Sequence, residues 1–287
     1  MNSLRKICAF LPTKFVIYVD NFRAYGKVLN LKEPKYYGEK IQWIKLYGQA
    51  ERYNNFVDKY LVRNYIEEKI GVEYLPKLYK IYKNADEIDY DKLPEKFALK
   101  LNNGSGGNII CRDKSLLDKK LARKKLNKLV KEKYYKYTKE PQYKNVKTMI
   151  ICEEYLENIN GDLIEYSLHC FDGEVKFIEV HTDRFNDYKE NFYYPDWSEA
   201  NFRGKIKNSA GYIEKPKELE RLIELGERLA EDFIYVRVDF NAVDDKFYFG
   251  ELTFTPANGT EAFYPIEQDL EIAKMIDLSK YKIENSY

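Results

Sequence analysis

The chain has 287 residues, 44% of them apolar, and its 48 basic and 47 acidic residues leave a formal net charge of +1. This apolar content is ordinary for a folded protein, and the length is more typical of two lobes than of one small domain. A charge so close to zero provides no overall field that would favour nucleic acid as a partner.

The four cysteines and two histidines exclude several kinds of site. Cys8, Cys111, Cys152 and Cys170 form no CxxC pair, and two histidines are too few for a zinc site at the usual spacings. We therefore expect four reduced thiols in a cytoplasmic protein. No segment approaches the roughly 20 apolar residues of a membrane span, so no transmembrane segment is expected.

In the first half of the chain, some segments show a clear helix or strand pattern of apolar residues and others do not. Residues 1 to about 50 show no long period, and residues 15–19 fit a short strand as well as one helical turn. From Asp58 apolar residues recur at helical spacing as far as a stop at Gly71. Strands are expected at 97–101 and 108–111, on either side of a glycine-rich loop. A lysine-rich amphipathic helix is expected from Ser115 to about Tyr137.

The second half alternates hairpins with one clear helix. Strands are expected at 149–152, 166–171 and 175–180, the last two joined by a turn at Asp172-Gly173. Pro216 opens a helix with a strongly apolar face. Strands at 235–242 and 246–252 flank Asp244-Asp245. Helices between antiparallel hairpins predict an α+β fold whose sheets are covered on one face.

Two segments have residues suited to a nucleotide. Lys100 precedes the loop Asn102-Asn103-Gly104-Ser105-Gly106-Gly107, whose glycines would let backbone N–H groups approach phosphate oxygens. A plain glycine-rich hairpin turn would also explain this loop. The strand at 149–152 leads into Glu153-Glu154-Tyr155-Leu156, which could face an adenine edge and a ribose. An ordinary exposed strand end is an equally good reading of these residues.

The last hairpin carries the strongest chemical signal. Alternation places Arg237, Asp239 and Asn241 on one face of their strand, and Glu251 and Thr253 on one face of the next. The turn between the strands lets Asp239 and Glu251 converge, and two carboxylates on a rigid hairpin suit Mg²⁺. Arg237 could hold an anionic substrate. The alternative is a surface hairpin with cross-strand ion pairs.

Taken in this order, the segments resemble the ATP-binding elements of the ATP-grasp superfamily, and more specifically the TupA-like ATP-grasp family of teichuronopeptide and capsular polysaccharide biosynthesis. The resemblance covers nearly the whole chain and rests on the segments PKYYGEKIQW (34–43), DKYLVR (58–63), LKLNNGSGGNIIC (99–111), ICEEYL (151–156), DRF (183–185), RVD (237–239) and GELTFTP (250–256). It implies the ATP-grasp fold, with two α+β lobes, the nucleotide between antiparallel sheets and a truncated N-terminal region. Residues 1–58 would form that region, and residues 59–287 the core, with an ATP-binding lobe at about 96–155 and a metal-binding lobe at about 156–287.

The resemblance also implies a role for individual residues. ATP would contact Lys59, Lys100, Gly104, Ser105, Gly106, Gly107, Glu153, Glu154, Tyr155, Leu156 and Glu165. Mg²⁺ would be bound by Asp239, Glu251 and Thr253, although many ATP-grasp ligases have Asn at the position of Thr253, so water or Asn258 could complete the shell instead. Arg237 and Lys100 would be catalytic. Weaker candidates for substrate contact are His181, Asp183, Arg184 and Asn258.

The implied activity is that of a ligase which uses ATP and Mg²⁺ to join a carboxylate to an amine through an acyl-phosphate. The family suggests a uronic acid carboxylate, in a small molecule or a bacterial surface glycan, joined to an amino acid or small amine. Association with membrane-bound polysaccharide machinery would fit this role, and the oligomeric state is left open. A sugar kinase with the same ATP elements and a non-catalytic nucleotide- or glycan-binding protein are the alternatives.

Overall fold

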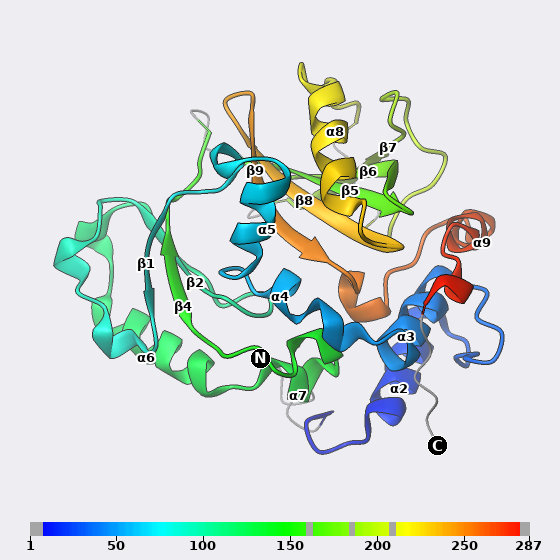
Figure 1. The fold of residues 1–287 in the computed structure, drawn as a ribbon, viewed down its shortest axis with the longest axis horizontal. Coiled ribbons are helices and arrows are strands. Elements are labelled where there is room, and N and C mark those ends of the chain that lie inside the picture. Colours follow the sequence, from blue (N-terminus) through cyan, green and yellow to red (C-terminus); the bar gives the residue numbers. More distant parts are fainter. Residues whose placement is uncertain (1–7, 159–162, 184–186, 207–210, 282–287) are drawn as a thin grey trace.

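The protein is described here by a computed structural model that covers residues 8–158, 163–183, 187–206 and 211–281 (Figure 1). Two antiparallel sheets dominate it. The smaller sheet has the order β1-β4-β2-β3, formed by Leu78–Tyr82, Ile150–Glu153, Phe97–Leu101 and Ile109–Cys111. The larger sheet has the order β7-β6-β5-β8-β9, formed by Lys189–Tyr193, Glu174–Thr182, Ile164–Phe171, Tyr235–Val243 and Lys246–Thr253. These sheets and the helices around them confirm the predicted α+β class.

The helices lie around and between the two sheets (Figure 1). They are α2 (Thr13–Tyr25), α3 (Tyr37–Tyr47), α4 (Asn54–Val57), α5 (Val62–Lys69), α6 (Lys119–Lys131), α7 (Tyr134–Thr138), α8 (Leu219–Ala230) and α9 (Ile266–Lys274). Helices α4 and α5 run between the sheets, whereas α2, α3 and α9 gather at one end of the molecule. No helix in the described part of the chain combines the length and apolarity that crossing a membrane requires.

The smaller sheet is covered on one face, as the sequence predicts, but the larger sheet is packed by α8 on one face and, at one end of its other face, by α3 and α9. In the smaller sheet, Phe97 and Leu99 are buried in a cluster with Leu126 of α6. In the larger sheet, Leu168 packs in a cluster with the apolar face of α8, and Gly226 permits a close approach, since an added Cβ would lie 2.5 Å from a Leu168 methyl group. Because side chains alternate along a strand, the opposite face of each sheet carries a different set of residues. In the larger sheet, Phe171, Phe177 and Tyr235 on this face lie in a second apolar cluster.

Most predicted elements occur close to their expected bounds. Residues 97–101 form β2, and both predicted hairpins of the larger sheet are present. The lysine-rich helix is shorter than expected: it ends at Lys131, where Glu132 turns extended, and α7 follows separately. The ambiguous residues 15–19 lie in α2, and strands β1 and β7 and helices α3 and α9 were not predicted.

Candidate active site

A cleft of about 780 Å³ lies between the uncovered faces of the two sheets. The smaller sheet and the residues directly after its strands contribute Ala98, Lys100, Ile110, Arg112, Glu153, Glu154, Tyr155 and Leu156. The larger sheet and its flanks contribute Leu163, Glu165, His181, Asp183, Asp239, Asn241, Phe249, Gly250 and Glu251. The glycine loop and residues 59–76 close the remaining sides with Lys59, Arg63, Leu75, Pro76, Gly104, Ser105, Gly106 and Asn108. The size suits a ligand as large as a nucleotide.

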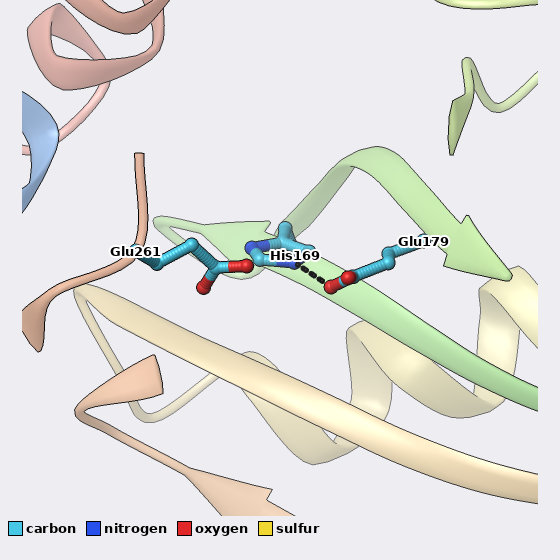
Figure 2. A group of neighbouring side chains, drawn as sticks. All are labelled: His169, Glu179 and Glu261. Carbon is cyan, nitrogen blue, oxygen red and sulfur yellow. Dashed lines mark hydrogen bonds and ion pairs between the residues drawn. The ribbon is translucent and has the colours of Figure 1, made fainter. Parts of the chain in front are cut away.

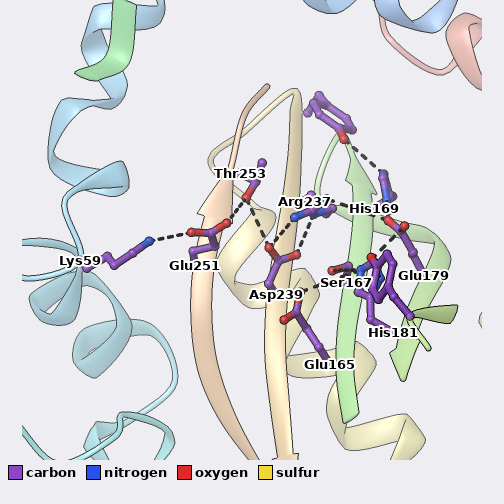
Figure 3. Close-up of polar contacts among 12 residues, drawn as sticks. Lys59, Glu165, Ser167, His169, Glu179, His181, Arg237, Asp239, Glu251 and Thr253 are labelled. Carbon is purple, nitrogen blue, oxygen red and sulfur yellow. Dashed lines mark hydrogen bonds and ion pairs between the residues drawn. The ribbon is translucent and has the colours of Figure 1, made fainter. Parts of the chain in front are cut away.

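The two carboxylates of the last hairpin face the cleft together (Figure 3). Asp239 of β8 lies directly opposite Glu251 of β9 in the register. A bulge at Gly250 sits beside this pair, and a side chain there would press on the Asp239 carbonyl, 3.0 Å from an added Cβ. The Thr253 hydroxyl lies 3.3 Å from Asp239 Oδ2 and 3.2 Å from Glu251 Oε1, so it faces both carboxylates.

Arg237 secures the buried member of this pair. Its Nε and Nη2 each donate to one oxygen of Asp239 at 2.8 Å, which is the bidentate geometry of a strong ion pair. Asp239 is only 3% exposed, so the guanidinium offsets the cost of burying its charge. Arg237 itself does not line the cleft but lies directly behind Asp239.

Lys59 joins the two walls of the cleft. Its Nζ lies 2.7 Å from Glu251 Oε2, and its backbone N–H donates to the carbonyl of Asn102 beside the glycine loop at 2.7 Å. Burial alone would raise the pKa of Glu251, but the Lys59 ammonium lowers it to about 2. Burial likewise opposes the charge of Lys59, but Glu251 outweighs it, and the pKa of Lys59 is raised. Both groups are therefore charged at neutral pH.

Lys100 and Glu153 form a second ion pair on the smaller sheet. Glu153 is 6% exposed and lies at the end of β4, next to β2 in the register. The Glu154 N–H donates to the carbonyl of Lys77 at 2.8 Å, and the Tyr155 hydroxyl accepts from Arg112 Nε at 2.7 Å. The segment from Glu153 to Leu156 thus lies along the cleft, with Glu153 held by Lys100.

The glycine loop has a conformation that favours glycine. Gly104, Gly106 and Gly107 have φ angles of +74°, +80° and +78°. An added Cβ on Gly104 would lie 2.5 Å from the ring of Tyr134, whereas one on Gly106 would meet nothing within 4 Å. Gly104, Ser105 and Gly106 line the cleft, but Gly107 instead packs against Leu129 of α6.

Of the other predicted site residues, some line the cleft and others do not. Glu165, His181 and Asp183 line the cleft. Asn258 does not: its side-chain and backbone oxygens accept hydrogen bonds from Lys45 of α3. Arg184 lies outside the described residues.

The donor set of the cleft fits a magnesium nucleotide. Paired carboxylates offer the hard oxygen ligands that Mg²⁺ prefers, and Lys59 and Lys100 offer positive charge for phosphates. Apolar side chains that could cover a base come from both walls: Leu75, Pro76, Ala98, Ile110, Leu163 and Phe249. Sequence reasoning missed Arg63 and Arg112, which add two guanidinium groups to the lining.

A buried acidic cluster beside the cleft was also missed. It consists of Glu179 on β6, Glu190 on β7 and Glu261 after β9, together with His169 and His181. Burial and the nearby Glu179 charge raise the pKa of Glu261 to about 8 and that of Glu190 to about 7. The alternation of polar residues at 167 and 169 and at 179 and 181 would have signalled a polar sheet face, but only the strand register brings these residues together.

The chain is similar to several solved structures. No curated protein matches this chain. Among solved structures, it is similar to D-alanine–D-alanine ligase from Bacillus anthracis complexed with ATP, at 18% identity and a TM-score of 0.39, over 77% of this chain and 66% of that one. It is also similar to D-alanine–D-alanine ligase from Helicobacter pylori, at 16% identity and a TM-score of 0.43, over 84% of this chain and 69% of that one. It is also similar to the ATP-grasp ligase PsnB complexed with its minimal precursor, at 12% identity and a TM-score of 0.41, over 76% of this chain and 60% of that one.

The chain thus spans about two thirds of the Bacillus anthracis ligase and 60% of PsnB. The match that decides the family is the model of the TupA-like ATP-grasp proteins, which aligns with residues 39–277. That range includes the lysines, the glycine loop and the paired carboxylates of the cleft. The chain belongs to the TupA-like ATP-grasp family.

Proposed function

We propose that this protein is an ATP-dependent ligase that joins a carboxylate to an amine through an acyl-phosphate. The observation that supports this most directly is the cleft between the sheets, where Lys59 and Lys100 face the paired carboxylates of Asp239 and Glu251. A lysine-rich wall opposite two acidic side chains is what a nucleotide triphosphate with its metal requires. Membership of the ATP-grasp family agrees with this chemistry.

The residues of the cleft would have distinct tasks. When bound, magnesium ATP supplies the phosphoryl group that activates the carboxylate. Asp239 and Glu251 would hold the metal, with Thr253 or water completing its shell. Lys59 would exchange its contact with Glu251 for a phosphate oxygen, and Lys100 would do the same with Glu153. Arg237, fixed behind Asp239, would orient that carboxylate.

The glycine loop and the residues after β4 would position the rest of the nucleotide. Backbone N–H groups of residues 104–106 would contact phosphate oxygens, because these residues line the cleft and the two glycines carry no side chain. Glu154, Tyr155 and Leu156 would line the adenine, and Glu165 would contact the ribose. Closure of the loop would exclude water, which otherwise hydrolyses an activated carboxylate.

The proposal extends to the identity of the two substrates. We infer a uronic acid carboxylate of a bacterial surface polysaccharide, or of its precursor, as one substrate and an amino acid or small amine as the other. His181 and Asp183, which line the cleft beside the larger sheet, would contact one of them. Because the reaction consumes ATP, we expect it to take place in the cytoplasm, next to the membrane-bound enzymes that assemble such glycans.

An ADP-release screen of candidate acids against candidate amines tests this proposal. The ligase requires both substrates together, and hydroxylamine added in place of the amine would trap the activated carboxylate as a hydroxamate. ADP release that requires a sugar hydroxyl and yields a stable phosphate ester would instead identify a sugar kinase. ATP binding without ADP release from any pair, unchanged by Asp239→Ala, would identify a non-catalytic binding protein.

A further inference from the structure

Three side chains from separate segments meet on the larger sheet (Figure 2). His169 of β5 is fully buried and Glu179 of β6 is 2% exposed, and they approach each other across adjacent strands with His169 Nε2 3.3 Å from Glu179 Oε2. Glu261, from the segment after the 3₁₀ turn Pro256–Gly259, points at the same place from the other side. Each side chain offers one ligand atom, and these atoms all lie within 4.8 Å of one another.

This group has more hydrogen-bond acceptors than donors. Among the described residues, the buried Oε2 of Glu261 has no hydrogen-bond partner. Arg237 is engaged mainly with Asp239, which binds two of its nitrogens, and its Nη1 lies 3.9 Å from Glu179. Buried carboxylates without partners are costly. Within the part of the chain that the structure describes, Glu261 Oε2 is therefore an unsatisfied acceptor beside Glu179 and His169, which a bound cation would satisfy.

The surroundings of His169 match those of a metal ligand. Its Nδ1 lies 3.2 Å from the hydroxyl of Tyr235, which in turn contacts the hydroxyl of Tyr37. A ligating histidine is normally held in this way through its second nitrogen, which fixes the ring and its tautomer. The separation of 3.3 Å between His169 Nε2 and Glu179 Oε2 equals the edge of a tetrahedron around an ion with bonds of roughly 2.0–2.1 Å.

A second group adjoins the first and shares Glu179. Glu179 Oε1 lies 3.7 Å from His181 Nε2, and Glu190 completes this second set. The chain has only two histidines, and both lie here. The remaining ligands are carboxylates from other segments of the chain, rather than cysteines and histidines at the short spacings of a zinc motif.

We propose that His169, Glu179 and Glu261 bind a divalent transition-metal ion such as Zn²⁺ or Co²⁺, separately from the magnesium site at Asp239 and Glu251. An imidazole nitrogen with two carboxylate oxygens favours such an ion over Mg²⁺, which prefers oxygen ligands alone. Arg237 lies between the two sites, since it contacts both Glu179 and Asp239. The ion would thereby help to fix the guanidinium that orients Asp239. This metal site does not depend on the ligase proposal.

Metal titration of the full chain tests the inference without any enzymatic assay. After chelator treatment and dialysis, Co²⁺ is added in the presence of excess Mg²⁺, which fills the oxygen-only sites. We expect one tightly held equivalent by elemental analysis, visible absorption from nitrogen ligation, and a melting temperature that rises with Co²⁺ or Zn²⁺ but not with further Mg²⁺.

Matched variants assign the binding. Glu261→Gln and His169→Gln keep side-chain size and should weaken Co²⁺ binding by more than the roughly 10–100-fold that changes around a ligand cause. Glu174→Gln, at an exposed position on the same strand as Glu179, should leave Co²⁺ binding unchanged. Circular dichroism checks that each variant is folded. Absence of a retained equivalent in the wild-type chain, or equal retention in both ligand variants, would overturn the proposal. The wild-type melting series keeps the test decisive if a variant does not fold.

Discussion

Replacing Glu251 by glutamine separates metal binding from fold stability. Glu251 pairs with Lys59 at 2.7 Å, but the side chains are 35% and 18% exposed. An ion pair this accessible contributes only about 0–1 kcal/mol to stability. For a chain of this size such a loss lowers the melting temperature by a few degrees at most. The variant should therefore stay folded, so a change in nucleotide binding can be assigned to the site.

The effect on nucleotide binding should depend on the metal. Loss of a charged ligand costs roughly 1.5–3 kcal/mol, which corresponds to a 10- to 100-fold weaker Kd for the magnesium complex of ATP. Metal-free ATP should behave differently, because neutralising Glu251 releases the Lys59 ammonium for a phosphate oxygen. We therefore expect Glu251→Gln to bind metal-free ATP as well as, or better than, the wild type.

Isothermal titration calorimetry with and without Mg²⁺ measures both affinities. The matched control is Glu231→Gln, which removes another carboxylate paired with a lysine, Lys69, at a position that does not line the cleft. This control should leave the Mg²⁺ dependence unchanged. If Glu251→Gln bound magnesium ATP with wild-type affinity, Glu251 would not be a metal ligand and the reasoning from the hairpin would be refuted.

Three further predictions follow from the same structure. Gly104→Ala should weaken ATP binding more than Gly106→Ala, because both strain a positive φ but only the first presses on Tyr134; equal effects in calorimetry would contradict this. Under native conditions only the thiol of Cys8 should react rapidly with an aromatic disulfide reagent, because Cys111, Cys152 and Cys170 are buried. After unfolding, all four thiols should react. Burial lowers the pKa of Lys45 to about 8 from 10.5, although Glu140 opposes this shift, so the unfolded chain binds that proton more tightly. Stability should then rise by roughly 1–2 kcal/mol from pH 8 to 9.5, and urea unfolding of Lys45→Met should show a flatter profile.

The sequence predicts those elements in which one face is apolar and the other is not. Strand β2 and helix α8 have such contrast, and their positions were found closely. Helix α3 was missed because it is buried on most sides, including Glu39, Gln42 and Lys45. Its polar side chains are satisfied by distant segments, as when Gln42 donates to the carbonyls of Asn258 and Gly259. Because polar and apolar residues of α3 are both buried, the helix shows no apolar face that recurs every three to four residues.

Only some residues of the candidate site could be predicted from the sequence to lie together. Asp239 and Glu251 could be placed together because a short turn joins their strands, and the register pairs them. Glu179 and Glu261 could not, since they are far apart in the chain and only the completed sheet and the segment after it bring them together.

The central claim is that magnesium ATP binds between the two sheets, with its metal on the last hairpin. A crystal structure with a non-hydrolysable ATP analogue and Mn²⁺ in place of Mg²⁺ tests this directly, because anomalous scattering locates the ion. We predict an anomalous peak within bonding distance of Asp239 and Glu251, phosphates against Lys59 and Lys100, and the base beside Tyr155. A nucleotide found elsewhere, or an ion that touches neither carboxylate, would contradict the assignment.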